Sequence, residues 1–221
     1  MQPVIRAARR SELAEVYELL EHAFPEAGRS LFVAQTEHDA TFRQRHGRVA
    51  MLDGRVAGYV RIFARTTLVQ GAPVAAGGVG SVATAPHARA RGIATALLRD
   101  ALRQMRRDGM RLSFLFTGIM PFYQRLGFRA VTQPYFEAVP RDAARTAAPG
   151  YDVHPIATGD LRVLLSIHRR AIAGTTGAVV RTTAAWRDAS HWLAEDPSGC
   201  LVASRAGRVC AYIRSRRREY G

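Results

Sequence analysis

The stretch from Gly77 to Leu98, GGVGSVATAPHARARGIATALL, contains the strongest local signals in this sequence of 221 residues. Its first part, Val79 to Thr84, is an apolar and β-branched run, which is typical of a buried strand. Pro86 ends that run, and a short loop of small residues and arginines follows. From Ile93 onward the apolar residues recur at helical spacing. The stretch therefore predicts a strand, a tight loop and a helix.

The predicted helix has one apolar and one charged face. The apolar face comprises Ile93, Leu97, Leu98, Ala101, Leu102 and Met105. The charged face comprises Arg99, Asp100, Arg103, Arg106 and Arg107. Gly109 stands where a helix C-cap is expected, so the helix should end just before it.

The loop before this helix has the features of an anion site. The backbone amides of Arg89 to Ala94 would point out of a helix N-terminus, where phosphate groups bind. Gly92 would let the backbone approach a phosphate with no Cβ in the way. The alternative is a solvated arginine loop that only caps the helix.

Two motifs resemble those of the GNAT acetyltransferase superfamily. Residues Arg89 to Ala94, RARGIA, resemble its (Gln/Arg)-x-x-Gly-x-(Gly/Ala) loop. Residues Pro121 to Phe128, PFYQRLGF, resemble the segment that follows its fifth strand. The resemblance implies an α/β fold of the GNAT (acyl-CoA N-acyltransferase) type, with a mixed, splayed central sheet. It also implies acetyl-CoA as co-substrate, with no metal.

The resemblance assigns roles to individual residues. Pantetheine would pair with the backbone of the strand residues Val82, Ala83 and Thr84. The pyrophosphate would be held by the loop residues Arg89, Ala90, Arg91, Gly92, Ile93 and Ala94. Tyr123 is the expected general acid, because a phenol is protonated at neutral pH and can give a proton to a departing thiolate. The alternative for Tyr123 is a tyrosine that only packs in the core.

The general base is not evident from the sequence. The predicted fourth strand lacks the glutamate that many members of the superfamily carry there. The polar residues expected near the acceptor side are His22, Glu26, Asp39 and Glu137. Each of these four is better explained as a surface residue, and a water relay is the alternative.

The first 140 residues predict the element order of the GNAT fold. Further strands are expected at residues 4–8, 49–52, 56–69, 112–116, 128–132 and 135–139, with the strand at 112–116 buried. Helices are expected at residues 11–24 and 31–44. Asp53-Gly54 predicts a type I′ hairpin turn. Gly77, Gly78 and Gly80 suggest a bulge or a close backbone approach in the strand before the loop.

Two segments in the last part of the chain resemble segments in the first part, which favours a duplication; the alternative is that both are ordinary amphipathic elements. Val153 to Leu161 aligns with Ile5 to Leu13, and Gly207 to Arg214 aligns with Gly54 to Arg61. The second copy would end at its third strand, without a phosphate loop. This arrangement resembles the Eis-type group of acetyltransferases with two tandem GNAT-like domains. The predicted organisation is a GNAT domain at 1–140, a linker at 141–150 and an incomplete second GNAT-like domain at 151–221. That second unit should need the first domain, or a second copy of the chain, in order to fold.

Charge and composition limit the kinds of molecule that the protein is expected to bind. The formal net charge is +14, and all 32 basic residues are arginines, which fits the coding bias of a GC-rich genome and suits anionic ligands such as coenzyme A. The arginines are scattered along the sequence without an aromatic stacking platform, so no nucleic acid is expected. Without a secretory segment or a long apolar run, we expect a cytoplasmic protein and no membrane partner.

The two cysteines give no sign of a metal site or a disulfide. No Cys/His cluster has metal-ligand spacing. In a hairpin with its turn at Ala206-Gly207, Cys210 should lie opposite Ala203 and Cys200 opposite Ile213. The two thiols would then point to opposite faces.

The functional hypothesis is an N-acetyltransferase that uses acetyl-CoA and a primary amine of a small molecule or protein. The alternative is a non-catalytic acetyl-CoA-binding or interaction module. Tyr123 and the intact loop favour the enzyme, whereas the missing base and the truncated second unit favour the module.

Overall fold

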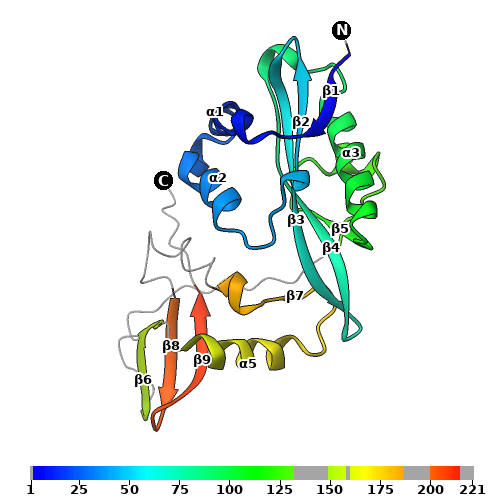
Figure 1. The fold of residues 1–221 in the computed structure, drawn as a ribbon. Coiled ribbons are helices and arrows are strands. Elements are labelled where there is room, and N and C mark those ends of the chain that lie inside the picture. Colours follow the sequence, from blue (N-terminus) through cyan, green and yellow to red (C-terminus); the bar gives the residue numbers. More distant parts are fainter. Residues whose placement is uncertain (1, 132–148, 158–159, 187–199, 215–221) are drawn as a thin grey trace. The chain divides into compact units, whose positions relative to one another are not determined.

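The computed structural model describes residues 2–131, 149–157, 160–186 and 200–214 (Figure 1). The chain divides into two compact units. Unit 1 comprises residues 1–130 and 175–180, and unit 2 comprises residues 131–174 and 181–221. Each unit has its own sheet and its own hydrophobic core. Of the linker predicted at 141–150, residues 141–148 lie outside the described part of the chain.

Unit 1 is built on a mixed sheet in the order β1-β2-β3-β4-β5. Its strands are β1 (Val4–Ala7), β2 (Gly47–Leu52), β3 (Arg55–Val69), β4 (Ala72–Thr84) and β5 (Leu112–Phe114). Neighbouring strands are antiparallel except β4 and β5, which are parallel. The predicted turn at Asp53-Gly54 is confirmed, because both residues have the positive φ angles that a type I′ hairpin requires.

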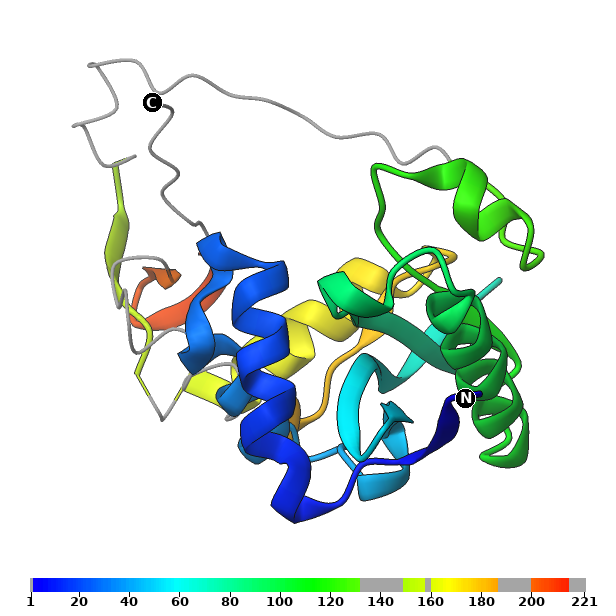
Figure 2. The same cartoon turned by 90° about the horizontal axis from the view of Figure 1, so that it is seen from above.

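Helices cover both faces of this sheet (Figures 1 and 2). The helices are α1 (Leu13–Ala23), α2 (Gly28–Glu37), α3 (Ile93–Arg107) and α4 (Met120–Gln124). Short 3₁₀ turns occur at Arg10–Glu12, Pro25–Ala27, Gln44–His46 and Pro86–Ala88. Helices α1 and α2 pack on one face and α3 on the other, with a separate buried cluster under each. No described helix has the length and apolar character needed to cross a membrane.

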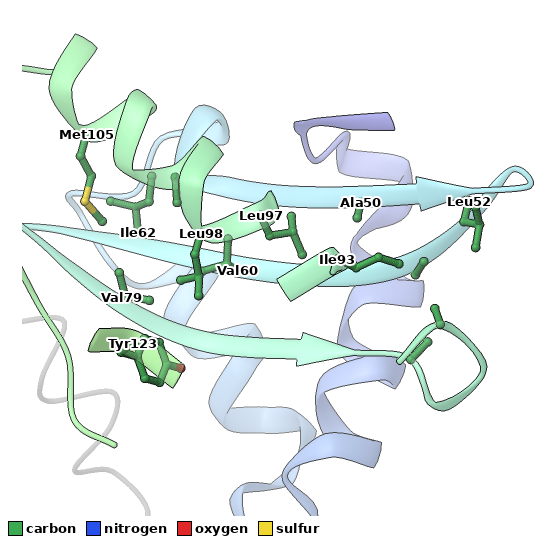
Figure 3. Close-up of a cluster of buried hydrophobic side chains, with 14 residues drawn as sticks. Ala50, Leu52, Val60, Ile62, Val79, Ile93, Leu97, Leu98, Met105 and Tyr123 are labelled. Carbon is green, nitrogen blue, oxygen red and sulfur yellow. The ribbon is translucent and has the colours of Figure 1, made fainter. Parts of the chain in front are cut away.

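The periodicity of α3 predicted its buried face. Ile93, Leu97, Leu98 and Met105 are all buried and pack on strand residues such as Val60 (Figure 3). Asp100, expected on the charged face, is instead only 8% exposed. Arg48 of β2 causes this, because its Nε donates to Asp100 Oδ2 over 2.6 Å and so allows both charges to be buried.

The helix predicted at residues 31–44 was wrong in its bounds. Helix α2 begins three residues earlier, at Gly28, and ends at Glu37. The carboxylate of Asp39 accepts hydrogen bonds from the amide and the hydroxyl of Thr41, at 3.0 and 2.6 Å. This local turn competes with further helix and ends α2 early.

The strand predicted at 112–116 is shorter and more exposed than expected. Strand β5 ends at Phe114, and Leu112 and Phe116 are 45% and 88% exposed. Strand β5 is the last strand in the described order, so it has a partner on one side only. Residues 128–131 of the next predicted strand have no regular structure, and its last residue and the strand at 135–139 lie outside the described residues.

Unit 2 contains a smaller sheet. Strands β6 (Tyr151–Pro155), β8 (Cys200–Arg205) and β9 (Arg208–Arg214) form it in the order β6-β8-β9. Helix α5 (Leu161–Ile172) contributes Leu164 and Leu165 to a core that includes Trp186, which is 1% exposed.

Equivalent strands pair in the same register within each of the two sheets. Ile5 pairs with Ala50 in unit 1, and the aligned Val153 pairs with Ala203 in unit 2. Both hairpins also have a register shift at the same aligned place, after Ala50 and after Ala203. The internal repeat seen in the sequence therefore extends to a shared β-bulge.

That bulge corrects the predicted positions of the cysteines. Ala203 pairs with Ala211, so Cys210 is the extra residue of the bulge, and Cys200 pairs with Arg214 instead of Ile213. Cys210 is a free, exposed thiol whose Sγ lies 3.3 Å from the carbonyl oxygen of Ala203.

A short strand from the later part of the chain joins the first sheet. Strand β7 (Val179–Val180) pairs with Thr66 and Thr67 of β3. Strand β3 extends well beyond the end of β2, so its far half has a free edge. Residues 175–180, predicted to belong to the second domain, fill this edge and are part of unit 1.

Candidate functional site

The candidate site lies where β4 and β5 separate. The two strands pair only from Ala76 to Gly78 of β4. Beyond Gly78, β4 continues to Thr84 along β3, but its other edge has no strand partner among the described residues. The strands are therefore splayed, and one edge of β4 offers free backbone groups to an extended ligand.

A β-bulge redirects β4 within this free segment. Tyr59 pairs with Ala83 and Arg61 pairs with Gly80, so Ser81 and Val82 together face a single residue of β3. Ser81 has a φ of +52°, in the left-handed region. The bulge thus lies at Ser81-Val82 and not at the glycines that suggested it. A bulge re-aims the backbone groups beside it.

The glycines of β4 provide close approach of side chains. A Cβ added to Gly77 would lie 2.6 Å from Met105 Sδ, and one added to Gly80 would lie 2.7 Å from Phe63 Cε2. These glycines let α3 and a neighbouring aromatic ring pack directly on the strand backbone.

The loop between β4 and α3 has two left-handed residues, Ala90 (φ 60°) and Gly92 (φ 74°). Helix α3 begins at Ile93, and no side chain caps its N-terminus. The first amides of a helix have no acceptor within it, so those of Gly92 to Ala94 are available to a ligand. The amide of Arg89 was also expected to be free for a phosphate, but it donates to the carbonyl of Pro86 over 3.3 Å.

The side chains of this loop leave its outer surface open. A Cβ added to Gly92 would meet no atom within 4 Å. Arg89 and Arg91 are exposed, and Arg89 makes one long contact of 3.4 Å with the carbonyl of Thr84. Ile93 is buried, so its side chain anchors the helix start in the core while its amide faces the loop.

Tyr123 lies in the same cluster of side chains as Val79 of β4 (Figure 3). Helix α4 positions it, and its ring packs edge-on against Phe122 and Phe128, at centroid distances of 5.0 and 6.0 Å. Burial raises the pKa of the phenol, so Tyr123 is protonated at neutral pH. Its hydroxyl makes no hydrogen bond to any other described residue.

Asp39 is not the surface residue that the sequence suggested. Its Oδ2 lies 3.0 Å from Nη2 of both Arg61 and Arg65, and its side chain is 5% exposed. Burial alone would raise the pKa of this carboxyl, but hydrogen bonds from Arg65 and Thr41 outweigh it and hold the pKa below the usual value. Asp39 is therefore a poor proton acceptor. His22 and Glu26 are exposed, and Glu137 lies outside the described residues.

Sequence reasoning missed the buried arginine that holds Asp39. Arg61 is 1% exposed, and its guanidinium lies between the rings of Phe42 and Phe63, at 4.4 and 4.5 Å from their centroids. The signal was present, because Arg61 interrupts the otherwise apolar run Val60-Arg61-Ile62-Phe63.

A second ionic cluster ties the end of α3 to the loop before β2. Asp108 accepts from Arg45 Nε at 2.9 Å and lies 3.1 Å from His46 Nε2. Burial lowers the pKa of His46, and the Asp108 carboxylate opposes this shift only in part. The described residues contain no group of His, Cys, Asp and Glu side chains that could hold a metal ion.

Comparison with known proteins gives a consistent result for the fold. A family model described as an acetyltransferase (GNAT) domain matches residues 4–131. A search of curated proteins found no match. A GCN5-related N-acetyltransferase from Anabaena variabilis superposes with a TM-score of 0.73 at 17% identity, over 96% of this chain and 53% of that one.

Two further solved structures are similar. A probable N-acyltransferase from Enterococcus faecalis has a TM-score of 0.73 at 18% identity, over 99% of this chain and 56% of its own. Eis1 from Mycobacterium abscessus has a TM-score of 0.67 at 19% identity, over 96% of this chain and 53% of its own. The chain thus spans about half the length of these structures.

Proposed function

Because the chain belongs to the GNAT acetyltransferase domain family, we propose that it transfers acetyl from acetyl-CoA to a primary amine of a small molecule or protein. The observation that carries this proposal is the free edge of β4, which runs directly into the loop at Ala90 and Gly92. An extended pantetheine arm and a pyrophosphate need these two surfaces in this order.

The residues present fit coenzyme A. The amides of Gly92, Ile93 and Ala94 would bind the pyrophosphate, because the space outside Gly92 is open and the helix is uncapped. Arg89 and Arg91 would add charge-assisted contacts. The backbone from Val82 to Thr84 would pair with the pantetheine arm.

The chemistry assigned to the chain is polarisation of a carbonyl and donation of a proton. When bound, acetyl-CoA supplies an activated acetyl thioester. The Val82 amide, redirected by the bulge, would polarise its carbonyl. Tyr123 would donate its phenolic proton to the departing sulfur, a role supported by a hydroxyl that is protonated at neutral pH and makes no hydrogen bond to another described residue. Since Asp39 is held by two arginines, we assign removal of the amine proton to water.

We also propose a domain organisation for the whole chain. Residues 1–140 would form the catalytic domain, 141–150 a linker and 151–221 an incomplete second GNAT-like domain of the Eis type, in a cytoplasmic protein. Residues 175–180 of that second domain would be the segment that joins the first sheet. The register shared by the two sheets supports a tandem duplication. The second unit would be stabilised by the first domain or by a second copy of the chain.

Release of free thiol from acetyl-CoA, measured with a panel of primary amines and polyamines, tests the activity. The enzyme should release thiol only with an amine present, and calorimetry should detect acetyl-CoA binding without one. A chain that binds acetyl-CoA but releases no thiol with any amine would instead be a non-catalytic binding module. A chain that does not bind acetyl-CoA would contradict both functions.

A further inference from the structure

Opposite charges are segregated on unit 1. Residues 86–131 carry nine arginines, all exposed, and two aspartates. Residues 11–42, which include α1 and α2, carry a single arginine and seven acidic residues, namely Glu12, Glu15, Glu18, Glu21, Glu26, Glu37 and Asp39. Helices α1 and α2 lie on the opposite face of the sheet from α3 (Figures 1 and 2). A coding bias toward arginine would account for the number of arginines but not for this separation.

The arginines of α3 form one continuous surface. Arg99, Arg103, Arg106 and Arg107 follow the spacing i, i+4, i+7 and i+8, which places them on one side of the helix. With Arg111 just beyond the helix, we call these five residues the arginine face. At 1.5 Å per residue, Arg99 and Arg107 are about 12 Å apart along the axis.

Among the described residues, the arginine face has almost no counter-charge. Arg99, Arg106 and Arg107 form no ion pair within the described residues, and Arg103 makes one at 3.2 Å to Asp100. The negative charge of Asp100 is already taken up by Arg48, and that of Asp108 by Arg45. The guanidinium groups therefore remain available to an anionic partner.

The far end of the arginine face is hollowed. An open depression of about 400 Å³ is lined by Arg106, Gly109, Met110 and Arg111. The Arg111 amide donates to the carbonyl of Ala75 over 2.8 Å, which fixes the backbone of this wall to β4. A phosphate group between two guanidinium groups would receive paired hydrogen bonds from each planar fork.

The proposed cofactor loop does not account for this surface. The loop lies at the start of α3, whereas Arg106 lies about 20 Å further along the helix axis. The arginine face therefore lies apart from the proposed cofactor site.

We propose that the arginine face binds the phosphate backbone of double-stranded nucleic acid without sequence preference. A duplex carries one charge per about 1.7 Å of axis, both strands counted, so about seven phosphates lie within the length of this face, and neutralising those in contact releases counterions. This revises the expectation from sequence, which rested on the scatter of arginines over the whole chain, because four arginines of the predicted charged face line one side of α3.

Other partners fit this surface less well. None of the large exposed apolar side chains lies on α3, so the helix has nothing to insert into a lipid bilayer. A protein partner would need an apolar centre to its interface, and the one large exposed apolar side chain directly beside Arg111 in sequence is Leu112, which lies beyond α3. Single strands need aromatic platforms, and the arginine face has none.

Fluorescence anisotropy with labelled duplex DNA and duplex RNA of about 20 base pairs tests the proposal over a range of salt concentrations. The test variant changes Arg99, Arg106 and Arg107 to Gln. The control variant changes three other exposed arginines, Arg9, Arg10 and Arg55, to Gln. The test and control variants therefore lose the same net charge. Matched thermal unfolding shows that both variants are folded.

The wild type and the control should bind both duplexes with affinities within about threefold of each other. The test variant should lose at least about tenfold, and its slope of log affinity against log salt should be shallower by about 2 to 3. A second variant, Arg106→Glu with Arg111→Glu, changes only the two arginines that line the depression and should also lose affinity for the duplexes. It replaces the triple variant if that variant is unfolded.

Three outcomes would overturn the proposal. The wild type could fail to bind either duplex at low salt. The test and control variants could lose affinity equally, which would reduce the effect to net charge. Vesicles of anionic lipid could bind more tightly than the duplexes and depend on the same three arginines, which would assign the surface to membranes.

Discussion

Arg61 Nη2 donates to Asp39 Oδ2 over 3.0 Å, and the two side chains are only 2% and 5% exposed. The pair joins the middle of β3 to the chain that follows α2. Because Arg61 is stacked between two aromatic rings, it cannot turn toward water if its partner is lost.

We therefore expect Asp39→Asn to destabilise the protein strongly. Removing one partner of a buried ion pair leaves an uncompensated charge and costs about 3–5 kcal/mol. Denaturant unfolding measures the loss. Asp53→Asn, in the exposed hairpin turn, is the control and should change stability by less than about 0.5 kcal/mol. Equal, small effects of both changes would show that the pair contributes little.

Tyr123→Phe should keep acetyl-CoA binding and lose turnover with the best amine. The change removes one proton donor and little volume, and general acid catalysis contributes about 10²- to 10⁴-fold. Steady-state kinetics and calorimetry measure the two effects separately. Tyr151→Phe in unit 2 is the matched control and should retain activity. Unchanged turnover in Tyr123→Phe would leave Tyr123 as a packing residue only.

Gly92→Leu should abolish acetyl-CoA binding. Its side chain would project from the outer surface of the loop, where the pyrophosphate is expected. Gly109→Leu is a close control, because Gly109 also has a φ of 74° and nothing within 4 Å of its Cβ position. Both variants carry the cost of a left-handed leucine, about 1–2 kcal/mol, but only the first should lose binding by calorimetry. Similar affinities would rule out the phosphate loop.

His46 should make the folded protein sensitive to mild acid. Its pKa is lowered in the folded state by burial, so the unfolded state takes up the proton first as the pH falls below about 6.5. The contribution of His46 to stability is therefore fully present above the pKa that His46 has in the unfolded state. It is lost as the pH falls toward the lower pKa that His46 has in the folded state. Denaturant unfolding at pH 7.5, 6.5 and 5.5 should show this decline.

His46→Gln should flatten the decline between pH 7.5 and 5.5, since an amide can still reach Asp108 but does not titrate. His87→Gln, at an exposed position, should leave the decline as in the wild type. A decline that persists in His46→Gln would mean that another group causes it.

Local signals in the sequence predicted the parts of the fold that local geometry determines. Helical periodicity predicted α3, and Asp53-Gly54 predicted its hairpin, because each feature depends on a few adjacent residues. The loop at Gly92 was predicted for the same reason.

Features that depend on distant residues were not predictable in this way. The burial of Asp100 depends on Arg48, and the burial of Asp39 depends on Arg61. The bulge at Ser81 depends on the pairing of β4 with β3, which no local pattern specifies. The charged face of α3 was predicted from the spacing of its arginines, but the withdrawal of its Asp100 into a buried pair with Arg48 was not.

Strand β7 has a consequence for the synthesis of the protein. Thr67 donates to the carbonyl of Ala178 over 3.0 Å, a contact between residues that are 111 positions apart. The first sheet can therefore form most of its strands early, but the distal edge of β3 stays open until the ribosome has translated residue 180. During that interval the open edge is able to pair with another nascent chain, so the order of translation exposes this edge to aggregation before its own partner exists.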